Sequence, residues 1–266
     1  MNIQHIDYQG SNIRYSQKGS GDALVLIHGF IGRIDIWKDM QDSLSKHFNV
    51  ICIELPGHGK SDLIADVLTM EVIGDMIKYI LKELRVAKAV MIGHSMGGYV
   101  LLDLVERHQE IFKGIGLFHS HALEDTAEAK ENRSRAVQLI EQNREGYISN
   151  FIDKLFAEPN REKFKTEISI LQKGAQNTAP ETLIASLLGM RERKEHIGTL
   201  VNLKIPAMFI LGKEDPRMSF PQLITQATLP QYSEILVLGE CGHMGYIEKY
   251  EETCSFIKSF TENCYK

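Results

Sequence analysis

The segment Gly93-His94-Ser95-Met96-Gly97-Gly98 holds a serine whose neighbours suit nucleophilic chemistry. It follows the apolar run 89–92 and opens a helical pattern, which places Ser95 on a sharp turn between a strand and a helix. Such a turn strains the backbone and leaves no room for side chains two residues to either side, a demand that glycines meet. The turn would raise the Ser95 hydroxyl above a sheet. It would also place the Met96 backbone N–H at a helix N-terminus, where it can stabilise a developing oxyanion.

The elements that would position this turn alternate between strand and helix. Apolar runs typical of strands lie at residues 3–8, 13–17, 23–27, 50–53, 89–92, 115–118, 207–211 and 234–238. Helical patterns lie at 34–44, 70–84, 96–108, 221–227 and 246–260. The alternation predicts an α/β fold, with a mostly parallel central sheet of about eight strands and helices on both faces.

The alternation stops between residues 121 and 199, where four helical patterns occur and no strand pattern does. Since a structureless loop of this length is implausible in a compact domain, we expect an inserted all-helical cap, 121–199. The core would then comprise residues 1–120 and 200–266. The charged run at 191–195 is typical of a solvated helix end.

Five motifs at strand ends resemble those of the α/β-hydrolase fold family, of the lid-bearing, esterase-like serine hydrolase kind. They are His28-Gly29-Phe30, Leu55-Pro56-Gly57-His58-Gly59-Lys60-Ser61, the turn at Ser95, Gly212-Lys213-Glu214-Asp215 and Gly242-His243. The family orders its triad as nucleophile, acid and histidine, and this chain offers Ser95, Asp215 and His243 in that order. Glu54, where relatives often carry Asp, departs from the pattern, and we expect little consequence.

The resemblance implies a role for each residue. His243 would take the proton of Ser95, and Asp215 would orient and stabilise the imidazole. The backbone N–H groups of Phe30 and Met96 would form the oxyanion hole. Side chains expected around the substrate pocket are His28, Gly29, His119, His121, Phe151, Leu155 and Leu187.

Other groups compete for these roles. Three other carboxylates could serve as the acid of the triad: Glu214, Glu124 and Asp125. The motif favours Asp215 over each of them. The His119-x-His121 spacing suggests a metal site, but no third ligand is close in sequence. We therefore expect neither a metal nor a cofactor.

Composition excludes several classes of function. The 266 residues carry a net charge of −5 and no Lys/Arg cluster, unlike a nucleic-acid-binding protein. No apolar run reaches the roughly 18 residues of a membrane span. The first residues lack a secretory pattern, and the four cysteines lack paired spacing. These features predict a cytoplasmic protein, a monomer or homodimer, that acts on a small molecule.

The first functional hypothesis is a carboxylesterase-like enzyme that cleaves a small, modestly apolar ester through an acyl-enzyme. The alternatives on the same triad are a lactonase, a C–C bond hydrolase or an elimination enzyme of the menaquinone pathway. Relatives of the last group often place Arg where this chain has Tyr99, which makes an elimination enzyme the less favoured alternative. A ligand sensor without turnover, on a hydrolase scaffold, is the alternative from another class.

Overall fold

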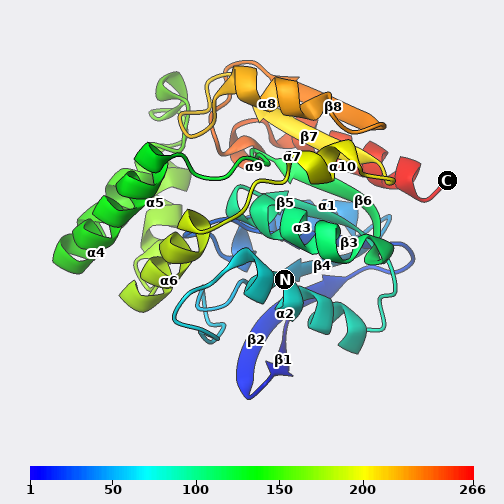
Figure 1. Ribbon diagram of the computed structural model, residues 1–266, viewed down its shortest axis with the longest axis horizontal. Coiled ribbons are helices and arrows are strands. Elements are labelled where there is room, and N and C mark those ends of the chain that lie inside the picture. Colours follow the sequence, from blue (N-terminus) through cyan, green and yellow to red (C-terminus); the bar gives the residue numbers. More distant parts are fainter.

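Eight strands form one sheet, in the order β1-β2-β4-β3-β5-β6-β7-β8 (Figure 1), in a computed structural model that describes all 266 residues. They are β1 (Ile3–Tyr8), β2 (Ser11–Lys18), β3 (Ala23–Ile27), β4 (Asn49–Ile53), β5 (Ala89–His94), β6 (Phe112–Phe118), β7 (Ala207–Gly212) and β8 (Ser233–Leu238). β2 runs antiparallel to both β1 and β4, and all the other pairs are parallel. The predicted α/β fold with a mostly parallel sheet of about eight strands is confirmed.

Helices connect the parallel strands and cover the sheet. They are η1 (Ile34–Trp37), α1 (Lys38–Leu44), α2 (Met70–Glu83), α3 (Met96–Arg107), η2 (Gln109–Ile111), α4 (Ala127–Asp153), η3 (Glu158–Asn160), α5 (Lys165–Ala175), α6 (Pro180–Arg191), α7 (Ile197–Val201), α8 (Phe220–Ala227), α9 (Gly245–Glu248) and α10 (Tyr250–Cys264). α2 packs against α3, which lies across the front of the sheet in Figure 1, and α1 packs against α10. β3 and β5 are buried along their whole length, as strands covered on both faces must be.

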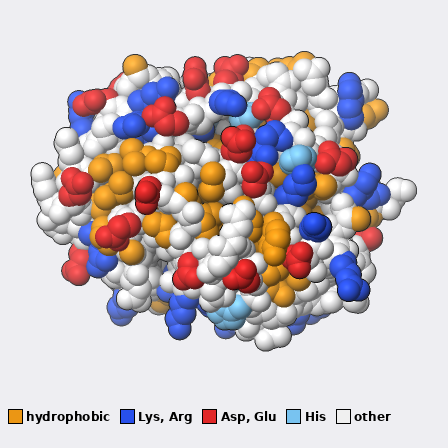
Figure 2. Space-filling model, turned by 60° about the horizontal axis from the view of Figure 1, so that its bottom comes forward, with side chains coloured by type: hydrophobic (Ala, Val, Ile, Leu, Met, Phe, Trp, Pro, Cys, Tyr) orange, Lys and Arg blue, Asp and Glu red, His pale blue; other side chains and the backbone are white.

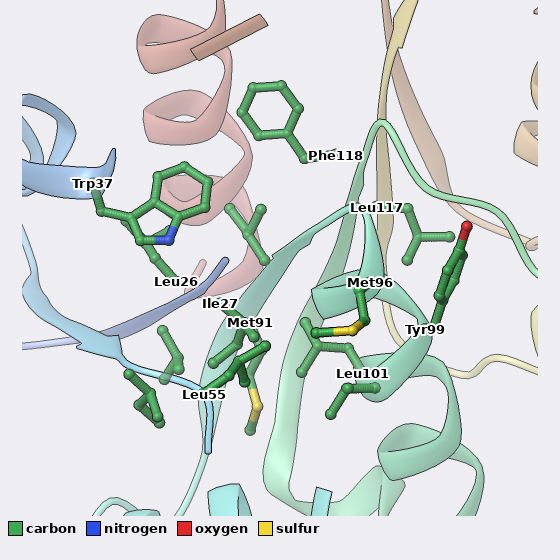
Figure 3. Packing of buried hydrophobic residues seen from close by; sticks show 14 of the residues in the cluster. Leu26, Ile27, Trp37, Leu55, Met91, Met96, Tyr99, Leu101, Leu117 and Phe118 are labelled. Carbon is green, nitrogen blue, oxygen red and sulfur yellow. The ribbon is translucent and has the colours of Figure 1, made fainter. Parts of the chain in front are cut away.

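The core lies between the sheet and these helices, and it fixes the start of α3. Figure 3 shows Met96 and Leu101 of α3 on one side of the central strands, with Leu26 and Trp37 on the other. All four side chains are fully buried. Because α3 begins directly after β5, this packing holds the strand-to-helix turn at Ser95 in place.

The helices α4, α5 and α6 lie together beside the sheet (Figure 1). α4 packs against both α5 and α6. It is kinked at Asn143, whose backbone is not helical (φ −155°, ψ 77°) and whose Oδ1 accepts a hydrogen bond from the Gly146 N–H at 2.9 Å. The second half of α4 therefore starts anew with its own side-chain cap.

A buried ion-pair cluster joins the two ends of this helical segment. Asp125, just before α4, accepts hydrogen bonds from Arg133 and from Arg193, which follows α6. Arg193 also donates to the Leu123 carbonyl at 3.1 Å and lies over the ring of Tyr99 at 4.2 Å. The expectation that 191–195 is a solvated helix end is therefore wrong for Arg193, which is only 6 % exposed because its partners enclose it.

No helix combines the length and the apolar character that crossing a membrane requires. On the face drawn in Figure 2, acidic and basic side chains are interspersed around apolar areas. That face carries no continuous basic surface of the kind that binds nucleic acid.

Candidate active site

Ser95 adopts a backbone conformation that its surroundings impose (φ 52°, ψ −117°). Its N–H donates to the Phe118 carbonyl at 2.9 Å, and its own carbonyl accepts from the Ser120 hydroxyl at 2.8 Å. A Cβ on Gly93 would lie 2.3 Å from the carbonyl carbon of Gly97, and a Cβ on Gly97 would lie 2.7 Å from the His28 carbonyl oxygen. These close approaches explain why neither position carries a side chain. Positive φ in a non-glycine residue costs free energy, and such strain concentrates at functional sites.

Asp215 follows β7 and His243 follows β8, and their side chains meet. His243 Nδ1 lies 2.7 Å from Asp215 Oδ2, and both residues are buried. Asp215 Oδ1 accepts from the backbone N–H groups of Arg217 at 2.8 Å and Met218 at 3.1 Å. Burial alone would raise the pKa of Asp215, but the adjacent imidazoles outweigh burial and hold that pKa well below its usual range.

The backbone of His243 is held on two sides. Its N–H donates to the Leu155 carbonyl at 2.7 Å, and its carbonyl accepts from His94 Nε2 at 2.8 Å. Burial, with the nearby His243 and His119 rings, lowers the pKa of His94 well below its ordinary value. A neutral His94 keeps one ring N–H as a donor, which suits this contact.

His119, Asp215 and His243 each place one possible metal-ligand atom within 4.8 Å of the others. Ligands of a tetrahedral zinc ion stand about 2.0–2.2 Å from the metal and hence about 3.3 Å from one another. The 2.7 Å between His243 and Asp215 is too short for that arrangement and is a hydrogen-bond length. His119 Nδ1 is 3.3 Å from the same Asp215 oxygen, but without hydrogen-bond geometry. The cluster therefore suits acid–base chemistry better than metal binding.

One pocket of about 260 Å³ brings Ser95 and His243 to a common wall. The core contributes Gly29 and Phe30, and the helical segment contributes Phe151 and Leu155. The rings of Phe30 and Phe151 meet edge to face at 5.4 Å. The site is thus closed by side chains from both parts of the chain, and most of its surface is apolar.

The two backbone N–H groups expected to form an oxyanion hole have no acceptor within the chain. Neither Phe30 nor Met96 donates to a backbone carbonyl or to a side chain. Phe30 lies on the pocket wall, and Met96 directly follows Ser95 at the first turn of α3. The next residue, Ile31, is held at φ 61°, so that this loop, like the Ser95 turn, is strained.

Four residues expected at the pocket lie elsewhere. His28 Nε2 accepts from the Leu55 N–H at 2.9 Å, within the core, and burial lowers its pKa to about 4. His119 is not part of the pocket wall and lies against Asp215. His121 Nε2 contacts the Tyr99 hydroxyl at 3.3 Å, and Leu187 is buried in α6. The position of these histidines at strand ends did not reveal that they do not line the cavity.

Several residues of the pocket wall were missed by sequence reasoning. Arg33 and Asp35 lie on the wall and pair with each other, and Arg33 Nη1 also donates to the Gly174 carbonyl of α5 at 3.1 Å. Ile170 and Leu171 of α5 complete that side. Arg33 could have been suspected from its place four residues after Gly29, whereas nothing in the sequence indicates which face of α5 meets the core.

Comparison with known proteins agrees with this architecture. A family model described as alpha/beta hydrolase fold matches residues 22–158. The dihydrolipoyllysine-residue acetyltransferase component of the acetoin cleaving system of Cupriavidus necator is 25 % identical over 260 residues, which are 96 % of this chain and 68 % of that protein. The (E)-2-((N-methylformamido)methylene)succinate hydrolase of Acinetobacter baylyi is 22 % identical over 93 % of both chains. The structure of a malate-bound thermophilic esterase from Thermogutta terrifontis superposes with a TM-score of 0.93 and 27 % identity, and covers 100 % of both chains.

Proposed function

The chain belongs to the α/β-hydrolase fold family and is a hydrolase, and from that premise we propose that it cleaves a small, modestly apolar carboxylic ester. The observation that carries the proposal is the buried 2.7 Å hydrogen bond between His243 and Asp215 beside a pocket that also holds Ser95. We assign Ser95 as nucleophile, His243 as base and Asp215 as the acid that orients it.

The reaction follows from where the protons lie. Because Asp215 accepts the proton on Nδ1 of His243, Nε2 is left free to take the hydroxyl proton of Ser95. The Ser95 oxygen then adds to the ester carbonyl carbon, and the N–H groups of Phe30 and Met96 stabilise the resulting oxyanion. The proton on Nε2 passes to the departing alcohol, which leaves an acyl-enzyme. Water adds to that ester while His243 accepts its proton, which returns to Ser95 as the carboxylic acid departs.

Pocket size and lining favour a short acyl group. A cavity of about 260 Å³ is below the roughly 300–1,000 Å³ of sites for drug-sized ligands. Its two charged side chains, Arg33 and Asp35, pair with each other. We further propose that residues 121–199 act as the cap of this pocket, since Phe151, Leu155 and α5 form its outer wall. The likeness to the Thermogutta terrifontis esterase supports an ester as substrate.

The test is hydrolysis of p-nitrophenyl esters from acetate to decanoate by native protein, Ser95→Ala and Ser255→Ala. Ser255 is an exposed serine of α10 and serves as the matched control. We expect native activity to peak at a short chain, to persist in Ser255→Ala and to vanish in Ser95→Ala. Equal activity of Ser95→Ala and native protein would refute the mechanism. Absence of native activity on every ester would refute the ester substrate, and lactones and diketones would then be assayed.

A further inference from the structure

Glu248, at the end of α9, is a buried carboxylate that the proposed reaction does not use. It is 5 % exposed, and all its hydrogen-bond donors are neutral N–H groups. Oε1 accepts from the backbone N–H groups of Gly242 at 3.0 Å and Met244 at 3.2 Å. Oε2 accepts from the Ala157 N–H at 3.1 Å and from Asn160 Nδ2 at 2.7 Å. A charge buried without an ionic partner is costly unless such donors surround it.

The donors of Glu248 belong to two segments that meet at the active site. Gly242 and Met244 flank His243, so that one carboxylate oxygen fixes the backbone before and after this residue. The other donors, Ala157 and Asn160, belong to residues 155–160, which follow α4 and begin with Leu155 of the pocket wall. The two segments touch through their backbones, because a Cβ on Gly242 would lie 2.3 Å from the Ala157 nitrogen.

We infer that Glu248 is a positioning residue for His243, which locks the histidine loop, residues 241–244, onto segment 155–160. The inference rests on the proposed function, in which His243 is the base. The His243 N–H reinforces the same junction by donating to the Leu155 carbonyl at 2.7 Å. The segment that closes the pocket and the loop that carries the base are therefore held as one unit. The imidazole keeps its alignment only while that junction is intact.

Glu248→Gln tests this role, since it keeps the shape but places an NH₂ group among N–H donors and removes the charge. We expect kcat to fall about ten- to a hundredfold, as misplacement of a catalytic group does, with KM within about twofold of native. Glu54→Gln is the control, because Glu54 is also fully buried and accepts from backbone N–H groups, but touches neither segment. Unlike Glu248, Glu54 also pairs with Arg14 at 3.0 Å.

Two outcomes overturn the inference. One is native kcat in Glu248→Gln. The other is an equal loss of kcat in Glu54→Gln. Should Glu248→Gln fail to fold, Asn160→Ala removes one donor and keeps the charge. We then expect a several-fold loss of kcat, and unchanged kcat contradicts the inference. A native protein inactive on all esters and unreactive toward a fluorophosphonate at Ser95 would instead refute the proposed function itself.

Discussion

The two oxygens of Asp215 face different partners, and this division controls the tautomer of His243. Oδ1 accepts from the N–H groups of Arg217 and Met218, while Oδ2 faces His243 Nδ1 at 2.7 Å. Both backbone groups can only donate, so the atom at the Oδ1 position must be an acceptor. That requirement makes the response to an amide at position 215 predictable.

In Asp215→Asn, the amide oxygen would take the Oδ1 position and the NH₂ group would face His243 Nδ1. Nδ1 must then accept, which moves the ring proton to Nε2, where it cannot receive the proton of Ser95. We expect kcat on the best p-nitrophenyl ester to fall by about 10⁴-fold, as loss of the correct tautomer does in a serine protease triad. Glu214→Gln, at the exposed rival acid next to it, should retain native kcat. A comparable loss in both variants would show that the acid has been misassigned.

At the scale of elements, the helical segment is tied at both ends by Asp125. This carboxylate, 4 % exposed, binds Arg133 within α4 and Arg193 beyond α6. Burial alone would raise the pKa of Asp125, but the two guanidinium groups outweigh it and lower that pKa. Removing one member of such a cluster leaves buried charge without compensation.

Asp125→Asn should therefore lower the free energy of unfolding by about 3–5 kcal/mol, the usual cost of breaking a buried pair. Urea denaturation followed by circular dichroism measures this change. Asp42→Asn is the control, since Asp42 pairs with Lys18 at 2.7 Å but both side chains are about half exposed. Such a surface pair contributes about 0–1 kcal/mol. Equal losses in the two variants would mean that the cluster does not hold the segment.

The elements themselves were predictable where local pattern decides, and contacts across the chain were not. The i, i+3, i+4 spacing of α2 marks a helix, and the apolar runs of β3 and β5 mark strands buried on both faces. The burial of Arg193 depends on Asp125, 68 residues away. The role of Glu248 depends on donors up to 91 residues away. No local pattern carries such pairings.

At the scale of the whole molecule, parallel strands explain why the residues of the sequence motifs come together at one edge of the sheet. β3, β5, β7 and β8 run in one direction, so that the residues after each strand meet at the same edge of the sheet. Ser95, Asp215 and His243 each follow one of these strands. The pocket was predicted less well, because it also depends on how α4 and α5 lie over that edge.

The same fold buries several histidines, and this should make the protein sensitive to acid. His28 and His58 are fully buried, and burial lowers their pKa values to about 4 and about 3. Unfolded histidines titrate near 6.5, so that below this pH the unfolded chain binds protons that the folded chain excludes. Their contribution to stability is complete above pH 6.5 and is lost as pH falls, at about 1.4 kcal/mol per histidine and pH unit.

We expect Tm to be nearly constant from pH 8 to 7 and to fall steeply from pH 6.5 to 4.5, before most carboxylates titrate. His58→Gln keeps a donor for the Pro56 carbonyl, which His58 Nδ1 contacts at 3.0 Å, and removes one titrating group. Its Tm should decline less steeply over this range than that of the native protein. His47→Gln, at an exposed histidine, should leave the slope unchanged. A native Tm that stays flat down to pH 4.5 would contradict this expectation. It would mean that the buried imidazoles take up protons in the folded state as readily as in the unfolded chain.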